Sequence, residues 1–275
     1  MMLSHNTHAE LEAKMQSLKG CGLPFAMATV VRTVNATSAK PGGKALLDAE
    51  GAILMGWVGG GCARGAIGKA AREAIRTGEP RFISLRPQEL LDTEGLAAGE
   101  TRDGVHFARN GCPSKGTMDV FVEPVLPLPE LVICGSGLVA LALADLGDRF
   151  DFKVRLCVTS TADVSPTGNV TLTQGFGFAT RGFVVVATQG QGDRDALRQA
   201  VSTDASYISF VGSTKKFDTL ARQLTEEDPK LGNRLRMIHA PAGLDINAIT
   251  PEEIALSILA QITQVRRSQR IGERK

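Results

Sequence analysis

The sequence contains little of what secreted or membrane-spanning proteins need. Its five cysteines are an odd number in 275 residues, and no two of them have CxxC spacing. This pattern excludes a secreted disulfide framework, so we expect reduced thiols and a cytoplasmic location. The N-terminal segment has no basic stretch followed by an apolar one, so we expect no signal peptide. The longest uncharged apolar run, residues 131–144, is too short to span a bilayer.

An excess of charge of one sign is also absent. The chain has 31 basic and 29 acidic residues, which are interspersed. Only the tail, QVRRSQRIGERK, is clearly basic, and we interpret it as a solvated chain end rather than a nucleic-acid-binding arm. We therefore expect neither nucleic acid nor a membrane as a partner. With 43% hydrophobic residues, the chain suits one large packed domain or two of ordinary size.

A proline-rich stretch, residues 124–130, separates two parts of different character. Its three prolines favour an extended connector. The pattern before it is α+β, whereas strands alternate with helical patterns after it, which is typical of parallel βαβ units. The predicted fold class is therefore α/β: an N-terminal α+β domain over residues 1–123, then a Rossmann-like, doubly wound parallel-sheet domain over residues 131–275.

The individual elements follow from periodicity and turn signals. The first part predicts helices at 7–19 and from the glycine run to about 77, a hairpin at 44–58, and strands at 24–34, 81–85, 105–109 and 117–124. The second part predicts strands at 130–134, 153–158, 182–189, 207–213 and 236–239, with helices at 138–147, 193–201, 215–224 and 250–267. The last helix has the clearest start, because Thr250 and Glu253 form a capping box around Pro251.

Three consecutive glycines, Gly59, Gly60 and Gly61, run directly into Cys62 and a helical pattern. Glycines allow backbone N–H groups to approach a ligand, and a helix N-terminus favours an anion. A cysteine there is expected to have a lowered pKa, and its thiolate is both a nucleophile and a soft metal ligand. A small buried residue that packs a tight turn is an equally good interpretation. The residues alone leave both open.

Two further segments of the first part carry candidate ligand groups. Cys112 lies in the turn NGCPSKG, where Lys115 places a cation near the thiol, although an incidental loop cysteine is the simpler interpretation. In the loop SAKPGGKALL, Lys40 and Lys44 with the intervening glycines suit an anion such as a pterin phosphate, and a solvated loop at the start of the hairpin is the alternative. Cys21 is interpreted as a loop residue, and Cys134 and Cys157 as core.

The second part contains a nucleotide-binding pattern. Gly135, Ser136 and Gly137 follow a strand and open a helix with Ala140 in the third position, which matches G-x-G-x-x-A. The acid expected after the next strand is missing: the sequence reads VTSTAD, and no acid occurs before Asp163. A Rossmann-like fold is predicted, but ordinary NAD binding is not. Residues at other strand ends are expected at the same crevice: Thr188, Gln189, Gly212, Ser213 and His239. For His239, a hydrogen-bonded histidine near a turn is the simpler interpretation.

Four segments together resemble the XdhC/CoxI family of accessory proteins for molybdenum hydroxylases such as xanthine dehydrogenase and aerobic carbon monoxide dehydrogenase. They are AKPGGKALLDAEGAILMGWVGGGC, NGCPSKGTMDVFVEP, YISFVGSTKK and HAPAGLDINAITPEEIALSILAQI. They cover both parts of the chain, and the last is especially specific.

The resemblance implies a maturation factor or chaperone rather than a turnover enzyme. Such a protein binds molybdenum cofactor (a molybdopterin dinucleotide), assists its sulfuration and hands it to the apo-enzyme. Cys62 and Cys112 then become candidates for catalytic contact with sulfur, Cys62 for molybdenum as well, and Lys44 for cofactor binding. The implied partners are an apo molybdenum hydroxylase, a cysteine desulfurase or another assembly factor, and a second copy of the chain.

Departures from the family pattern fall around these sites. Arg64 stands where the family has an acid two residues after the first cysteine, and Gln189 ends a strand where the family has VVxTH. The glycine turn reads G-S-G-L-V-A instead of G-A-G-H-V-G. These changes suggest a divergent branch of the CoxF kind, linked to carbon monoxide dehydrogenase. Two rival functions stay open: an NAD(P)-dependent oxidoreductase and a non-catalytic scaffold for the apo-enzyme. The Rossmann-like domain is also a candidate to bind a nucleotide, NAD(P) or FAD.

Overall fold

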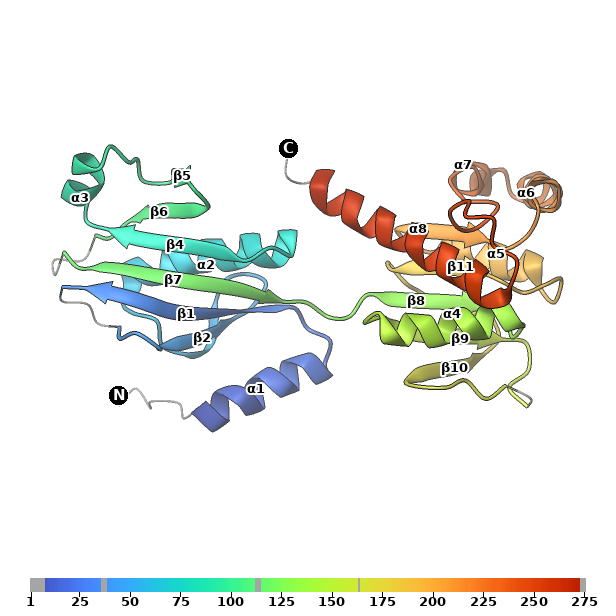
Figure 1. The fold of residues 1–275 in the computed structure, drawn as a ribbon, viewed down its shortest axis with the longest axis horizontal. Helices are drawn as coiled ribbons and strands as arrows, with labels where there is room; N and C mark the ends of the chain where they lie inside the picture. Colours follow the sequence, from blue (N-terminus) through green and yellow to red (C-terminus); the bar gives the residue numbers. More distant parts are fainter. Residues whose placement is uncertain (1–7, 36–38, 112–114, 163, 273–275) are drawn as a thin grey trace. The chain divides into compact units, whose positions relative to one another are not determined.

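The chain folds into two compact units, residues 1–127 and 128–275, which are described one at a time from a computed structural model (Figure 1). The structure describes residues 8–35, 39–111, 115–162 and 164–272, without the side chains of residues 62 and 269–272. The first unit ends inside the proline-rich stretch. Its last strand continues through Pro124 to Val125, so the regular structure runs slightly beyond the expected boundary at residue 123.

The N-terminal unit is a seven-stranded mixed sheet with helices on both faces. The strand order is β3-β2-β1-β7-β4-β6-β5, and all described pairs are antiparallel except β4 with β6. Its elements are α1 (His8–Gly20), β1 (Phe25–Val34), β2 (Lys44–Leu47), β3 (Ile53–Gly56), α2 (Gly61–Thr77), β4 (Arg81–Arg86), α3 (Gln88–Thr93), β5 (Thr101–Arg102), β6 (Val105–Arg109) and β7 (Thr117–Val125).

Alternation along the strands places α2 and α1 on opposite faces of this sheet. Ala45 and Leu47 belong to the core beneath α2, whereas Leu46 between them packs with Leu11 and Leu18 of α1. The hairpin and α2 lie where the sequence predicted them. The loop expected between β4 and β6 contains the short helix α3 and the strand β5, which the sequence did not indicate.

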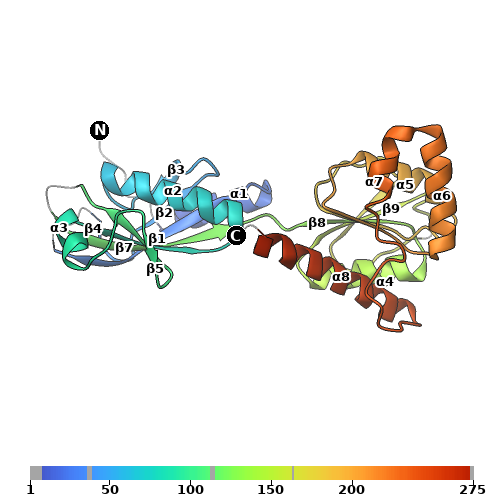
Figure 2. The ribbon, with the colours of Figure 1, turned by 90° about the horizontal axis from the view of Figure 1, so that it is seen from above.

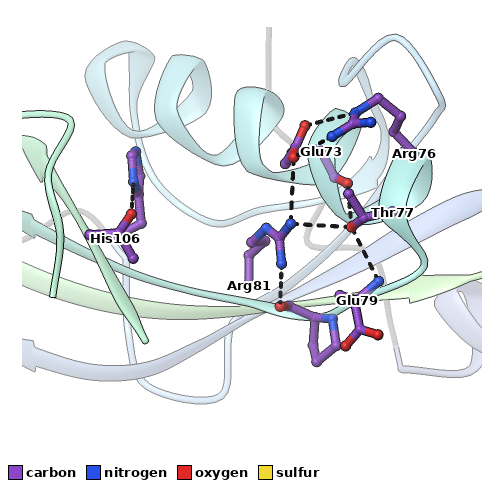
Figure 3. A network of polar contacts seen from close by, with 8 residues as sticks. Glu73, Arg76, Thr77, Glu79, Arg81 and His106 are labelled. Carbon is purple, nitrogen blue, oxygen red and sulfur yellow. Dashed lines mark hydrogen bonds and ion pairs between the residues drawn. The ribbon is translucent and has the colours of Figure 1, made fainter. Parts of the chain in front are cut away.

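A polar network fixes the C-terminal end of α2 (Figure 3). Glu73 forms ion pairs with Arg76 at 2.8 Å and with Arg81 of β4 at 3.5 Å. Arg81 also donates to Thr77 Oγ1 at 3.2 Å. The hydrogen bond from Arg76 is the main cause that lowers the pKa of Glu73, against the opposing effect of burial. These contacts tie the helix end to β4, while Gly78 closes the helix in a left-handed conformation.

The C-terminal unit is a five-stranded, all-parallel sheet with helices on both faces (Figure 2). The strand order is β10-β9-β8-β11-β12. The chain adds β9 and β10 on one side of β8, then crosses over and adds β11 and β12 on the other side, as in doubly wound folds. Its elements are β8 (Glu130–Cys134), α4 (Leu138–Arg149), β9 (Lys153–Val158), β10 (Val170–Gln174), β11 (Phe183–Val186), α5 (Asp193–Ser202), β12 (Tyr207–Phe210), α6 (Thr214–Glu227), the 3-10 turn η1 (Pro229–Leu231), α7 (Gly232–Leu235) and α8 (Pro251–Gly272).

Both faces of the central strands are buried, which explains their uninterrupted apolar sequences. Leu131 and Ile133 of β8 pack in the core formed with α4 and α8, whereas Val132 and Cys134 face the core beneath α5 and α6. None of the helices in the described ranges is both long and apolar enough to cross a membrane.

The final helix begins as its capping box predicted. Thr250 Oγ1 accepts from the N–H of Glu253 at 3.3 Å, and the Glu253 carboxylate accepts from the N–H of Thr250 at 2.9 Å. The predicted strand at 236–239 is wrong. The preceding residues form α7, and only His239 pairs, as an isolated bridge to Ser209. After this bridge the chain leaves the sheet edge and enters the turn that contains Pro241.

Candidate functional site

The glycine run of the N-terminal unit forms a tight turn that opens α2. Gly59 has φ +116°, a region that side-chain-bearing residues rarely adopt. Gly60 is the N-cap and, having no side chain, provides no side-chain cap to the helix. Its carbonyl accepts the N–H groups of Ala63 and Arg64, each at 3.1 Å. The backbone of Cys62 therefore belongs to the first turn of α2, as the sequence predicted.

The lysine and glycine loop lies directly against this turn. A Cβ placed on Gly43 would be 3.2 Å from the carbonyl oxygen of Trp57, and one placed on Gly59 would be 3.8 Å from Cβ of Ala39. Trp57 also donates its N–H to the carbonyl of Lys44 at 2.8 Å. The fold thus brings together two motifs that sequence reasoning could only name separately.

The side chain of Arg64 folds back over the glycine turn that precedes α2. Its guanidinium carbon lies 4.9 Å from the centre of the Trp57 ring, and its Nε donates to the carbonyl of Gly59 at 3.4 Å. This stacking is a cation–π contact. The cation therefore braces the turn. The side chain of Cys62 lies outside the described structure.

The second cysteine motif lies only partly within the description. Cys112 and Ser114 fall outside the described residues, so their place is a prediction. Lys115, expected as a cation near that thiol, pairs with Glu89 of α3 at 2.5 Å, and its closeness to the thiol stays a prediction. The strand that follows returns to the first motif: Met118 Cε would lie 3.6 Å from a Cβ on Gly59.

A buried carboxylate that the sequence did not single out lies on β7. Asp119 is 5% exposed, accepts from Arg32 Nε at 2.7 Å and accepts from Ser84 Oγ at 2.7 Å. Arg86 Nε donates to the same Ser84 oxygen at 3.0 Å. An acid within an otherwise apolar strand was the available signal. Its partners satisfy it within the sheet, so we assign it a structural role.

In the C-terminal unit the glycine turn joins β8 to α4. Gly135 has φ +132°, and a Cβ there would lie 2.3 Å from the carbonyl oxygen of Ala187. The loops after β8 and β11 are therefore in backbone contact at the point where the strand order reverses. Gly137 is the N-cap of α4 and provides no side-chain cap. Ser136 lies between the two glycines, half-buried.

Of the other predicted strand-end residues, Thr188 is held by a buried carboxylate. Asp193, at the start of α5, accepts from Thr188 Oγ1, from the N–H of Gly190 at 3.0 Å and from Lys216 of α6 at 2.5 Å. Burial alone would raise its pKa, but these hydrogen bonds outweigh burial and hold the pKa of Asp193 below its ordinary value.

Gly212 and Ser213 lie between β12 and α6, where Ser213 caps the helix by accepting from the N–H of Lys216 at 3.3 Å. His239 stacks on Tyr207, with ring centres 4.9 Å apart, and its backbone bonds β12 residues on both sides. Ser213 and His239 therefore have clear structural roles at this edge of the sheet.

Two predicted core cysteines, Cys134 and Cys157, are register partners on β8 and β9, and both are fully buried. The hydrogen bond that the Cys134 thiol donates to Cys157, together with burial, raises the pKa of Cys134 well above its ordinary value. These thiols therefore pack the sheet as the sequence predicted. Within the described ranges, no three His, Cys, Asp or Glu side chains are grouped to hold a metal ion.

The parallel strand order, the glycine turn at the reversal point and the helices on both faces define the C-terminal unit as a Rossmann domain. A family model described as "XdhC Rossmann domain" matches residues 131–262, and one described as "XdhC and CoxI family" matches residues 21–86. The chain therefore belongs to the XdhC and CoxI family.

Two curated relatives are similar to this chain. "Uncharacterized protein YqeB" of Escherichia coli is 29% identical over 255 residues, which cover 88% of this chain and 44% of the relative. A protein of Bacillus subtilis, named as a probable xanthine dehydrogenase subunit, is 28% identical over 163 residues, 55% of this chain and 47% of the relative. The chain thus spans less than half the length of both relatives. A solved structure described as a xanthine dehydrogenase from Bacillus halodurans is 19% identical, with a TM-score of 0.42 over 93% of this chain and 95% of that one.

Proposed function

We propose that this chain is an accessory protein for the maturation of a molybdenum hydroxylase of the xanthine dehydrogenase type. Membership in the XdhC and CoxI family supports this role, as does the relative whose name is that of a probable xanthine dehydrogenase subunit. The observation that carries the proposal is the turn at Gly59–Gly61, which places Cys62 in the first turn of α2. The same turn lies against the loop that bears Lys44.

In this proposal the N-terminal unit handles sulfur or metal. The N-terminus of a 17-residue helix stabilises negative charge, so a thiolate at Cys62 would be favoured there. Cys62 then acts as a molybdenum ligand or as a carrier of sulfur, with Cys112 as the second candidate. Lys44 would contribute positive charge toward a cofactor phosphate, since its strand begins beside the same turn.

The Rossmann domain would hold the nucleotide end of molybdenum cofactor in its dinucleotide form. The turn at Gly135 and Gly137 fits a diphosphate, because it opens α4 without a side chain at the N-cap. The residues after β9 fit an ordinary NAD site less well. Val158, Thr159 and Ser160 offer no carboxylate for ribose hydroxyls, and Asp163 lies outside the described residues.

The departures around Arg64 and Gln189 favour a CoxF-like branch, and with it a carbon monoxide dehydrogenase as client. The finer role that we propose is help with sulfuration of the cofactor, assembly of the metal centre, or insertion into the apo-enzyme. Soft thiolate ligands at Cys62 would suit either a molybdenum–sulfur or a copper–sulfur group.

Replacement of Cys62 by alanine tests this proposal in cells that make a client enzyme. We expect the purified client to lose sulfur and activity, or to lose molybdenum as well if Cys62 holds the metal. Cys21→Ala is the matched control, because Cys21 is an exposed thiol of the same unit, outside the turn. A fully loaded and active client in the Cys62→Ala strain would contradict the sulfur role.

Two rival functions predict different results. An NAD(P)-dependent oxidoreductase, which the glycine turn alone would favour, predicts tight binding of NADH or NADPH together with hydride transfer. A non-catalytic scaffold predicts that both Cys62 and Cys112 are dispensable, whereas surface substitutions abolish binding of the apo-enzyme.

A further inference from the structure

A side chain already lies on the turn that we propose as the nucleotide site. A Cβ placed on Gly137 would be 2.4 Å from Oε1 of Gln189, 2.6 Å from its Cδ and 3.0 Å from its Nε2. The three nearest atoms thus all belong to one carboxamide, which contacts the α-carbon of Gly137. In Rossmann turns this glycine lets a diphosphate come close to the backbone. Here the carboxamide occupies that space.

The backbone that carries this carboxamide is held in place. Gln189 has φ +51°, a left-handed conformation, and Gln191 donates its N–H to the carbonyl of Thr188 at 2.9 Å. Gly190 on the other side donates to the buried Asp193 carboxylate at 3.0 Å. Because the turn is fixed on both sides, the carboxamide can leave Gly137 only by rotation of the Gln189 side chain. Gln189 is exposed, so solvent can receive the rotated side chain.

A ligand phosphate and the Gln189 carboxamide therefore compete for the space beside the α-carbon of Gly137. The first turn of α4, which begins at Leu138, offers backbone N–H groups and the positive end of the helix dipole to an anion. The neutral amide in contact with Gly137 blocks the closest approach of such an anion. A nucleoside without phosphate does not need this space.

Resting on the nucleotide site proposed above, we propose that Gln189 gates the diphosphate cradle. Its side chain covers Gly137 in the empty site and must rotate away before a nucleoside diphosphate or dinucleotide can reach the start of α4. The gate lowers affinity for diphosphates by the free energy of the contacts that the carboxamide loses when it rotates away from Gly137. That cost corresponds to a factor of about three to ten in Kd.

Calorimetric titration of the full chain with ADP, CDP and adenosine tests the gate. Gln189→Ala removes the carboxamide, so the Kd values for ADP and CDP should fall by about three- to tenfold, while that for adenosine stays unchanged. Gln189→Ser should behave like Gln189→Ala. Gln189→Glu places a carboxylate beside the phosphates and should raise both Kd values. Gln191→Ala is the matched control, a glutamine of the same turn, and should leave all three Kd values unchanged.

Unchanged or weaker diphosphate binding by Gln189→Ala would overturn the gate, and weaker binding would identify Gln189 as a phosphate donor instead. If ADP and CDP bind neither the wild type nor any variant, the nucleotide site of the proposed function fails, and the gate fails with it. Tighter adenosine binding by Gln189→Ala would also overturn the gate, because it would place the effect away from the phosphates.

Discussion

Two helices of this protein begin after glycine turns, and the two turns are built differently. The turn before α2 is open on one side: a Cβ on Gly61 would meet no atom within 4 Å. The turn before α4 is closed by its neighbours, since a Cβ on Gly135 would strike the Ala187 carbonyl and one on Gly137 would strike Gln189. Glycine is therefore a steric requirement at Gly135 of the second turn. At Gly61 of the first turn, by contrast, there is space for a side chain.

The two turns are also stabilised by different kinds of contact. Arg64 lies across the first turn by stacking on Trp57, a contact between neighbours in sequence. The loop after β11, which closes the second turn, is held by a buried carboxylate, Asp193, that joins this loop to α6. The first turn therefore leaves open space at Gly61, whereas the second forms a cradle whose shape is fixed by contacts between loops.

The largest effect is expected from Gly135→Ala. This residue has φ +132°, and the new Cβ would lie 2.3 Å from a backbone oxygen, so the loops after β8 and β11 must separate. We expect a loss of about 3–5 kcal/mol from the stability of the C-terminal unit. Urea unfolding can be followed for each unit separately, because Trp57 and Tyr207 are the only tryptophan and tyrosine of the chain.

Gly61→Ala is the matched control for Gly135→Ala, since the space around Gly61 is open. We expect the stability of the N-terminal unit to change by less than about 1 kcal/mol. Equal losses in the two variants would show that the two turns do not differ as the structure indicates.

An intermediate effect is expected from Asp193→Asn. The variant weakens the hydrogen bonds from Thr188, Gly190 and Lys216, and we expect a loss of about 1–3 kcal/mol at pH 7. Because the folded-state pKa of Asp193 lies below its unfolded value, its contribution is complete above the unfolded pKa and is lost as pH falls through the folded pKa.

Urea unfolding monitored at Tyr207 therefore should show a difference between wild type and Asp193→Asn at pH 7 that shrinks below about pH 4. A difference that stayed constant or grew as the pH fell would contradict the assigned role of the carboxylate.

The smallest effect is expected from Arg64→Ala. It removes a cation–π contact at 4.9 Å and a long hydrogen bond at 3.4 Å, so the N-terminal unit should lose about 0.5–1 kcal/mol. Arg64→Lys keeps the charge without the planar group and should recover part of the loss. Circular dichroism at increasing urea concentration measures both variants, since the substitution also alters the fluorescence of Trp57. No change in either variant would mean that the stacking does not brace the turn.

Elements with local signals could be predicted from the sequence. The hairpin at β2 and β3, the start of α2 after three glycines and the capping box at Thr250 all depend on residues close together in the chain. Strand β10 was missed, because VTLTQ is partly polar and lies at the edge of the sheet. Residues 236–239 were predicted as a short strand, but only His239 pairs.

The candidate sites show the same limit. Periodicity and turn signals placed Gln189 at the end of a strand, but its contact with Gly137 joins loops that are 52 positions apart in sequence (189 − 137). Likewise, the ion pair of Lys115 with Glu89 could not be predicted, because the sequence did not indicate α3 at all. Contacts of this kind depend on how the loops pack, which local patterns do not contain.

The proposed function requires that the open turn before α2 bind molybdenum or sulfur through Cys62. The most direct measurement is made on the protein purified from its own host. It determines the content of molybdenum, of pterin and of bound sulfur other than that of the cysteine and methionine residues. We predict that all three co-purify with the wild type and with Cys21→Ala, and that Cys62→Ala loses the molybdenum or the sulfur. Equal amounts in Cys62→Ala and the wild type would contradict the claim.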